Sequence, residues 1–307
     1  MQRVAVTGAT SMLGVALVKE CIEHGIEVLA IIRRHSLHKD RLPDSELLVV
    51  CECNLDSLDD LDTFEKMDRP YDVFYHMAWA YTAKEQRDNP VLQEKNIKYT
   101  LDAVRLAKEL GCKKFIGAGS QAEYGKVDGI ITPDTPVNPL TAYGMAKYAA
   151  GVMSKKLCEQ CQILHIWGRI FSVYGRYDRE GTMINYAIDC FLKGKTAKFS
   201  LATQMWDYLY EEDAGKIFFL IGERVSKNQV YCIAKGESRI LKEYIMEIKD
   251  IFGLAACVFS EEIGGGDTIS LQADVEAYVK DIGYQPQCSF RRGIRNLIEY
   301  QGGKQSS

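Results

Sequence analysis

The sequence lacks an excess of charge of either sign. Its 38 lysines and arginines nearly balance 42 aspartates and glutamates, which leaves a formal net charge of -4. A basic surface is the usual footprint of a protein that binds a phosphate backbone, so nothing in this balance predicts nucleic acid as a partner. Any anionic ligand must therefore be held by local groups.

Long apolar runs are missing as well. No stretch has the length that a bilayer-spanning helix needs, so we expect no contact with a membrane. The first residues enter an apolar strand pattern without the basic segment and apolar core of a secretory signal. We therefore expect a cytoplasmic protein, and its ten cysteines to be reduced thiols, because disulfides are rare in that compartment.

Cysteine pairs at the spacing of a metal site are scarce. Cys158 and Cys161 form one C-x-x-C, and Cys51 and Cys53 form one C-x-C, but no second pair follows at the spacing of a zinc site. The first pair also falls within a segment with a helical pattern. We predict packed thiols at these positions and no metal site.

Up to about residue 170, short apolar runs alternate with amphipathic stretches. This pattern predicts an α/β fold with a Rossmann-type doubly wound parallel sheet and crossover helices. The expected strands are residues 3–7, 27–32, 47–51, 73–77, 114–118 and 162–166. The expected helices are residues 13–24, 96–110 and 143–160.

Beyond residue 175 the alternation weakens, although residues 182–194 and 240–252 still have helical patterns. We expect residues 1–174, joined by part of 205–233, to form a dinucleotide-binding domain. Residues 175–204 and 234–300 are expected to form a smaller carboxyl-terminal substrate-binding region, and residues 301–307 a disordered tail. The proline-rich segment 128–141 is expected to be a loop that approaches the active site.

A tight turn follows the first expected strand. It reads Thr7-Gly8-Ala9-Thr10-Ser11-Met12-Leu13-Gly14 and leads straight into a helix. A strand, turn and helix in this order direct backbone amides and the positive helix end at a pyrophosphate. Gly8 allows close approach and Gly14 close helix packing, whereas Ser11 occupies the middle glycine position. A plain strand-to-helix turn is the alternative interpretation.

The end of the second expected strand bears on the choice between NADP and NAD. Residues 31–35 read Ile-Ile-Arg-Arg-His, without the acid that would hold a free ribose hydroxyl. Arg33 and Arg34 suit the 2′-phosphate of NADP, because arginine binds phosphate through two parallel hydrogen bonds. A solvated basic turn is the alternative, and Asp40 could fold back onto the ribose. The expected cofactor is NADP or NAD, with NADP preferred.

Three residues form a candidate catalytic set. Tyr143 and Lys147 stand four apart in an expected helix, so their side chains share one face. A nearby ammonium stabilises phenolate and lowers the pKa of a tyrosine, which can then give or take a proton. Ser120 follows an expected strand, at the edge of the sheet where ligands of doubly wound folds bind.

In chain order, these motifs resemble those of the extended short-chain dehydrogenase/reductase family, in particular the NAD-dependent epimerase/dehydratase group that acts on nucleotide-sugars. The resemblance covers nearly the whole chain. It includes the turn, the catalytic set, His76-Met77-Ala78 and Asn96, and it continues through residues 168–175 and 206–214.

The resemblance implies roles for individual residues. Tyr143 would be the general acid/base, Lys147 would bind the nicotinamide ribose, and Ser120 would orient the substrate oxygen. Asn54 stands where the family commonly has an aspartate that touches adenine. The implied cofactor-binding residues are Gly8, Thr10, Ser11, Met12, Leu13, Gly14, Arg33, Arg34, Asn54, Leu55, Met77, Ala78, Trp79, Asn96, Tyr143, Lys147 and Ile170.

On the substrate side, the implied residues are Ser120, Gln121, Tyr143, Arg176, Arg179 and Trp206, with the two arginines as candidates for the phosphates of a nucleotide-sugar. The resemblance also implies a homodimer formed through the helices around Asn96 and Tyr143. Trp206-Asp207 stands where many epimerases have Arg-Asp, so one phosphate contact of the family is missing or moved.

Three functions stay open at this point. The first is reduction of a 4-keto-6-deoxyhexose nucleotide with NADPH, which Arg33 and Arg34 favour. The second is NAD-dependent 4-epimerisation of the UDP-glucose 4-epimerase type, and the third is dinucleotide binding without catalysis. The complete catalytic set argues against the third. Dehydration is disfavoured, because Gln121 and Ala122 replace the Asp-Glu pair of the family's dehydratases.

Overall fold

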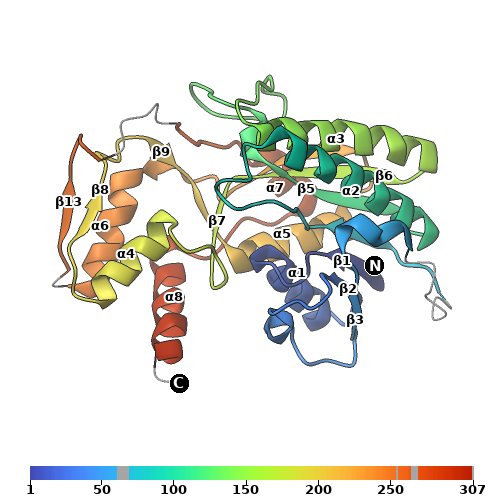
Figure 1. Ribbon diagram of the computed structural model, residues 1–307, viewed down its shortest axis with the longest axis horizontal. Helices are drawn as coiled ribbons and strands as arrows, with labels where there is room; N and C mark the ends of the chain where they lie inside the picture. Colours follow the sequence, from blue (N-terminus) through green and yellow to red (C-terminus); the bar gives the residue numbers. More distant parts are fainter. Residues whose placement is uncertain (61–68, 254, 264–268, 306–307) are drawn as a thin grey trace.

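The computed structural model describes residues 1–60, 69–253, 255–263 and 269–305, and a seven-stranded sheet forms its centre (Figure 1). All of the sheet's strand pairs are parallel, and the strand order is β11-β6-β5-β4-β1-β2-β3. The strands are β1 (Arg3–Thr7), β2 (Glu27–Ile32), β3 (Leu48–Glu52), β4 (Val73–His76), β5 (Lys114–Ser120), β6 (Leu164–Ile170) and β11 (Gln229–Ile233). The predicted Rossmann-type sheet is confirmed.

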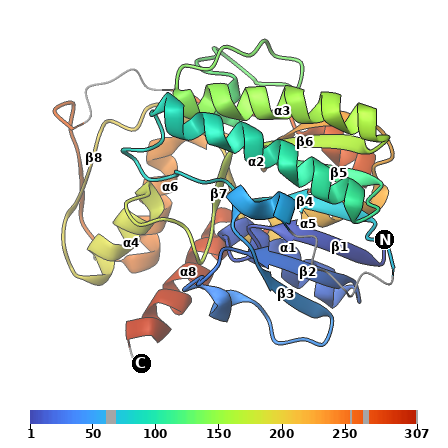
Figure 2. The same ribbon diagram turned by 45° about the vertical axis from the view of Figure 1, so that its right-hand side comes forward.

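Helices cover both faces of this sheet. α2 (Pro90–Glu109) and α3 (Ala142–Cys161) pack together on one face, and α1 (Met12–Glu23) and α5 (Glu211–Arg224) pack together on the other (Figures 1 and 2). Central strands buried on both faces are therefore apolar almost throughout, as in β2, where five of six residues are buried. We call the sheet and these four helices the sheet region.

Several element boundaries differ from the sequence prediction, and two of the differences have a clear local cause. α2 begins six residues before Asn96, because Asn89 caps it and Pro90 occupies its first turn. The Asn89 Oδ1 accepts hydrogen bonds from the backbone N–H groups of Val91 (3.1 Å) and Leu92 (3.2 Å). Strand β6 begins later than expected, because Gln162 ends α3 in a left-handed conformation with φ of 59°.

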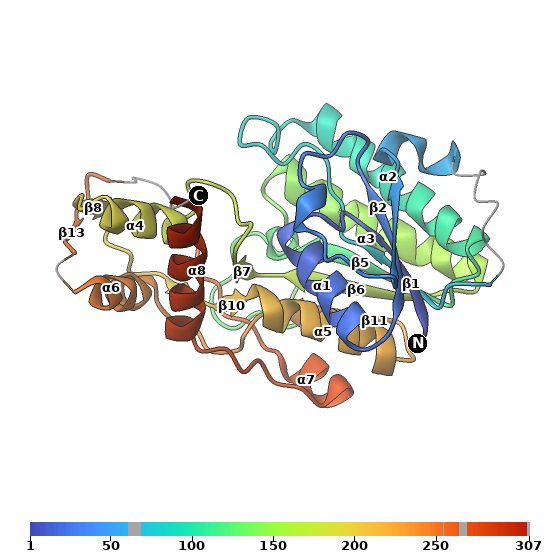
Figure 3. The same cartoon turned by 90° about the horizontal axis from the view of Figure 1, so that it is seen from below.

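A second group of elements lies beside the sheet, on the left of Figures 1 and 3. It contains α4 (Met183–Leu192), α6 (Leu241–Phe252), α8 (Phe290–Gln305) and the parallel strands β8 (Ala197–Phe199) and β13 (Cys257–Phe259). The helices expected at 182–194 and 240–252 are thus present. Large rings dominate its buried core, among them Tyr174, Phe191, Phe199, Tyr208, Tyr210, Tyr244 and Phe290. We call this group the aromatic region.

Short elements connect the two regions. β7 (Ser172–Tyr174) pairs with β10 (Tyr208–Tyr210), and β9 (Met205–Trp206) pairs with β12 (Arg239–Ile240). The chain then returns to the sheet through α5 and β11. α7 (Glu276–Ile282) and the 3-10 turns η1 (Lys39–Arg41), η2 (Leu55–Asp60) and η3 (Gln121–Glu123) complete the described elements. The exact division of the chain into domains stays a prediction.

In the structure, α8 continues to Gln305, through most of the segment expected to be a tail. Two contacts explain this order. The ring of Tyr300 meets the ring of Tyr177 edge to face at 5.8 Å, and the Gln301 amide donates a hydrogen bond to Asn185 Oδ1 at 3.3 Å. Residues 306–307 lie outside the described part of the chain.

Two further observations concern membranes and metals. Within the described ranges, no helix combines the length and apolarity needed to cross a membrane. Those ranges also hold no group of three or more His, Cys, Asp or Glu side chains arranged to bind a metal ion. Cys158 of the C-x-x-C is packed in the apolar core beneath α3.

Candidate active site

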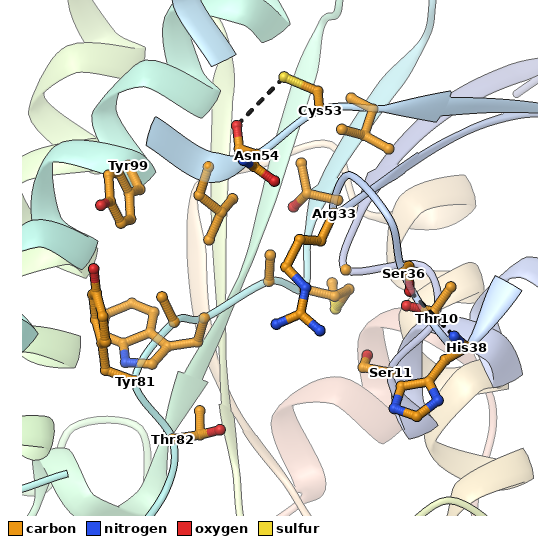
Figure 4. Close-up of a pocket in the computed structure, with 18 of the residues that line it drawn as sticks. Thr10, Ser11, Arg33, Ser36, His38, Cys53, Asn54, Tyr81, Thr82 and Tyr99 are labelled. Carbon is orange, nitrogen blue, oxygen red and sulfur yellow. Dashed lines mark hydrogen bonds between the residues drawn. The ribbon is translucent and has the colours of Figure 1, made fainter. Parts of the chain in front are cut away.

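A cavity of about 860 Å³ opens at the carboxyl ends of β1, β2 and β4 (Figure 4). The order of the sheet reverses between β1 and β4, which is where doubly wound folds bind their ligands. Nine of the predicted cofactor residues line this cavity: Gly8, Thr10, Ser11, Arg33, Asn54, Leu55, Met77, Ala78 and Trp79.

The turn after β1 is shaped by two close approaches. Gly8 has a left-handed φ of 68°, and a Cβ on it would lie 2.7 Å from the backbone nitrogen of Ala78. A Cβ on Gly14 would lie 2.2 Å from the carbonyl oxygen of Gly8, so the helix can start against the turn only with glycine there. Ser11 caps α1, since its Oγ accepts a hydrogen bond from the Gly14 N–H at 3.1 Å. Thr10 and Ser11 line the cavity, so the amino-terminal end of α1 lies beside it.

The other predicted cofactor residues do not line the cavity: Met12, Leu13, Gly14, Arg34, Asn96, Tyr143, Lys147 and Ile170. Of these, Asn96 acts on the cavity wall. Its buried amide accepts a hydrogen bond from the Ala80 N–H (2.8 Å) and donates one to the Ala80 carbonyl (3.1 Å). Asn96 thus fixes the loop after β4 that carries Met77, Ala78 and Trp79.

One end of the cavity is cationic. Arg33, His38 and Arg41 line it together with Ser36, and Figure 4 shows the Arg33 guanidinium directed into the space. Arg41 also donates a hydrogen bond to the Thr10 carbonyl (3.3 Å) and lies 4.5 Å from the ring centre of Tyr177.

Acidic side chains are nearly absent from the same wall. Asp40, considered above as a ribose ligand, lies in η1 and does not line the cavity. Among the described lining residues, Asp56 alone is acidic, and it belongs to the segment of Asn54 and Leu55. Arg34 is not part of the lining either, although its backbone N–H donates to Asn54 Oδ1 at 3.1 Å.

Trp79 joins this cavity to the catalytic set. The Nζ of Lys147 lies 3.7 Å from the ring centre of Trp79 and donates a hydrogen bond to the Ala118 carbonyl at 2.5 Å. Lys147 is only 3% exposed, and burial lowers its pKa to about 7, against the opposing effect of Glu123. The ring of Tyr143 meets the same indole edge to face at 6.0 Å.

The electrostatic surroundings of Tyr143 differ from the sequence expectation. Burial raises its pKa above the ordinary value, while a hydrogen bond from Ser120 and the charge of Arg87 lower it. The Arg87 guanidinium lies 4.2 Å from the centre of the phenol ring, closer than the Lys147 Nζ at 5.8 Å. Arg87, which the sequence did not single out, is therefore the nearer of these two cations to the Tyr143 ring and lowers its pKa.

Ser120 ends β5 and caps η3, where a buried carboxylate holds it. The Ser120 N–H donates to Glu123 Oε1 at 2.8 Å, and Arg169 Nε donates to Glu123 Oε2 at 2.7 Å. Sequence reasoning missed both residues of this ion pair. The Ser-x-x-Glu spacing of a capping box was the available signal for Glu123.

The predicted substrate residues lie in different surroundings. Arg176 is already paired, with its Nε on Glu211 (2.5 Å) and an Nη on Glu212 (2.9 Å). Arg179 is exposed and donates to the Thr82 carbonyl at the cavity wall (3.3 Å), so it is the freer of the two arginines. Gln121 is the first residue of η3 and lies next to Ser120. In β9, Trp206 has a buried indole N–H without a hydrogen-bond partner among the described residues.

Comparisons with known proteins agree with this geometry. The model of the NAD-dependent epimerase/dehydratase family matches residues 4–234. The chain is similar to a putative UDP-glucose 4-epimerase of Methanocaldococcus jannaschii, at 24% identity over 304 residues and 97% of each chain. It is also similar to a dTDP-4-dehydro-6-deoxyglucose reductase of Escherichia coli, at 23% identity over 317 residues and 96% of each chain.

Among solved structures, the fold is similar to that of the UDP-N-acetylglucosamine 4-epimerase from Methanobrevibacter ruminantium M1. The TM-score is 0.87 at 21% sequence identity, and 99% of each chain is covered. At this identity the likeness establishes a shared fold.

Proposed function

The chain belongs to the NAD-dependent epimerase/dehydratase family, and we propose that it reduces a keto group on the sugar of a nucleotide-sugar. The most specific form of this proposal is reduction at carbon 4 of a 6-deoxy-4-ketohexose nucleotide. The observation that carries it is the cationic end of the cavity, where Arg33, His38 and Arg41 suit the 2′-phosphate of NADPH. A reductase consumes one reduced dinucleotide in each turnover, whereas an epimerase returns its dinucleotide to the starting oxidation state within the same turnover.

The residues around the cavity fit a dinucleotide. Gly8 leaves room for a pyrophosphate beside the backbone of Ala78, and Thr10 and Ser11, at the amino-terminal end of α1, line the same cavity. Figure 4 shows the Arg33 guanidinium directed into the same space. When bound, the dinucleotide would supply the hydride for the reaction.

Within the catalytic set, Tyr143 donates its phenolic proton to the substrate oxygen as the attached carbon is reduced. Burial raises the pKa of Tyr143, so the phenol stays protonated at neutral pH, which is the form that a proton donor needs. The hydroxyl of Ser120 orients the same oxygen by a hydrogen bond. Lys147 is the proposed ligand of the nicotinamide ribose, and it lies behind Trp79, next to the cavity.

A 4-epimerase is the second candidate. The names of the relative in M. jannaschii and of the M. ruminantium structure favour it. Ser120, Tyr143 and Lys147 would serve this reaction equally, first in oxidation and then in reduction of the same carbon. The two candidates therefore differ in how the dinucleotide is used rather than in the catalytic set.

We also propose a homodimer formed through α2 and α3. Large apolar side chains are exposed on these helices: Val91, Met145, Val152 and Met153. Because α2 and α3 pack against each other, these exposed apolar side chains suit an interaction surface. Sedimentation velocity should give about twice the chain mass of 34.6 kDa, and a single-chain mass would contradict the dimer.

Two nucleotide fragments test the cationic end without any sugar substrate. By calorimetry, adenosine 2′,5′-bisphosphate should bind at least about tenfold more tightly than 5′-AMP, because it alone carries the 2′-phosphate. Arg33→Ala should abolish the difference. Arg34→Ala is the matched control, since Arg34 lies outside the cavity lining and its loss should leave the difference in place. Equal affinities in the unmodified protein would contradict the use of NADPH.

The dinucleotide carried by the protein then separates the two candidates. Freshly purified protein should be denatured and the released dinucleotide identified and quantified by mass spectrometry. An empty site that binds added NADPH, with NADPH oxidised in step with sugar reduction, supports the reductase. Near-stoichiometric NAD, together with interconversion of sugars without net oxidation, would replace that proposal with the epimerase.

A further inference from the structure

Glu123 lies directly behind Ser120 and is fully buried. Its Oε1 accepts hydrogen bonds from the Ser120 N–H (2.8 Å) and from the indole N–H of Trp167 (2.9 Å). Its Oε2 accepts one from the Nε of Arg169 (2.7 Å). One carboxylate therefore gathers donors from the end of β5 and from the neighbouring strand β6.

Arg169 extends this contact toward α3. It is 7% exposed, its guanidinium lies 4.5 Å from the ring centre of Tyr124, and an Nη donates to the Pro133 carbonyl (3.3 Å). Pro133 belongs to the loop that leads into α3, the helix of Tyr143 and Lys147. The ion pair thus links the end of β5 that carries Ser120 to the loop that precedes α3.

Two glycines of β5 leave space for the side chains of Glu123 and Trp167. A Cβ on Gly119 would lie 2.7 Å from Glu123 Oε1 and 2.3 Å from the Trp167 Nε1. A Cβ on Gly117 would lie 2.2 Å from the ring of Trp167. A buried ion pair is weak evidence for a role in stability, because desolvation offsets much of its attraction. Its position beside titrating catalytic groups points instead to the reaction.

We propose that Glu123, paired with Arg169, is a positioning residue for the reaction proposed above. It fixes Ser120 through the Ser120 N–H and supplies a buried negative charge that favours the protonated form of Lys147. Glu123 touches neither substrate nor dinucleotide in this role. The inference rests on the proposed function for the parts played by Ser120 and Lys147.

The charges around Lys147 give the direction in which its pKa should change when Glu123 loses its charge. Burial lowers the Lys147 pKa to about 7, the negative charge of Glu123 raises it and the positive charge of Arg87 lowers it. The nearby His76 is itself buried, with a pKa lowered to about 3, so it is neutral at working pH. Glu123 also raises the pKa of Tyr143. Loss of its charge therefore moves both pKa values to lower pH.

Glu123→Gln tests the charge while keeping an oxygen acceptor for the Ser120 N–H. We expect kcat at pH 7.5 to fall about tenfold, with little change in the substrate KM. The pH at which activity is lost on the alkaline side should move to lower pH. Trp167→Phe is the matched control, because it removes a donor from the same carboxylate oxygen without changing any charge, so its alkaline limit should stay in place. Glu123→Asp keeps the negative charge, so its alkaline limit should lie close to that of the unmodified protein.

A readout that needs no substrate accompanies the kinetics. In protein labelled with ¹⁵N-lysine, the Nζ signal of Lys147, assigned with Lys147→Arg, should titrate near pH 7 and should titrate at lower pH in Glu123→Gln. If the unpaired charge of Arg169 prevents Glu123→Gln from folding, the double variant Glu123→Gln with Arg169→Gln removes both charges. The Lys147 titration is then measured in this double variant.

Two results would overturn the inference: an unchanged Lys147 titration in the charge-free variants, or a kcat loss that is uniform across pH and matched by Trp167→Phe. Failure of the proposed function is recognised separately, because it would appear as turnover that does not depend on Tyr143. The Lys147 titration would still decide the role of Glu123 in that case.

Discussion

The sheet region and the aromatic region differ in how directly chain order sets the position of a residue. In the sheet region, Gly8, Ala78 and Ser120 each stand at or just after the end of a parallel strand, so they must meet at one edge. In the aromatic region, Tyr174 donates a hydrogen bond to the carbonyl of Phe290, 116 positions away. Only packing of several segments brings such residues together. The sequence therefore predicts the cofactor side of the site better than the substrate side.

The largest effect should come from the sheet region. Tyr143→Phe removes the proposed proton donor and should lower kcat about 10³-fold. Dinucleotide affinity, measured by calorimetry, should change little, because Tyr143 does not line the cavity. Tyr148→Phe, on the same helix, should keep normal turnover. Undiminished turnover in Tyr143→Phe would show that Tyr143 is not the proton donor. The sheet region would then no longer be distinguished by carrying the catalytic set.

A smaller effect, on stability alone, is expected in the aromatic region. Phe290 is 5% exposed, and its ring lies 4.7 Å from that of Tyr244 and 5.3 Å from that of Tyr174. Phe290→Ala should lower the free energy of unfolding by about 3–4 kcal/mol through the cavity it leaves. Urea denaturation measures this loss. Dinucleotide affinity of the folded variant should be unchanged, and a matching loss of affinity would show that the two regions are not independent.

The smallest effect per residue concerns acid, and it should again appear in the sheet region. Burial lowers the pKa of His76 to about 3 and that of His165 to about 4. Below about pH 6.5 the unfolded chain binds protons that the folded chain does not, so stability falls as the pH drops toward 4. Each histidine should cost roughly 2 kcal/mol at pH 5. The aromatic region has no histidine.

Denaturant unfolding at pH 7 and pH 5 measures this acid effect. His165→Phe keeps a ring between Phe115 and Trp167 and removes one titrating group. The variant should lose roughly half as much stability between the two pH values as the unmodified protein. An equal loss in both would place the acid sensitivity elsewhere in the molecule.

Local sequence signals were sufficient for most of the sheet region. The parallel sheet with crossover helices followed from the alternation of strands and helices, and Ser120 was placed correctly at a strand end. The start of α2 was also encoded locally, by Asn89 as a cap and Pro90 in the first turn. The prediction relied on the spacing of apolar residues alone and therefore placed the start of the helix at Asn96.

The missed features depend on contacts that are distant in sequence. Arg176 read as free for a phosphate, yet Glu211 and Glu212, 35 and 36 positions away, hold its guanidinium. Arg33 and Arg34 are equivalent in the sequence, and only the course of the chain after β2 brings one of them into the cavity. Spacing along the chain contains no information on such pairings until the fold is known.

The three tryptophans of the chain occupy three different environments. Trp79 lies on the cavity wall against the ammonium of Lys147, Trp167 contacts the carboxylate of Glu123, and Trp206 packs at the edge of the aromatic core. The molecule therefore contains its own optical probes. Variants that keep a single tryptophan would report by fluorescence, without any added dye, on dinucleotide binding, on the catalytic set and on the substrate side in turn.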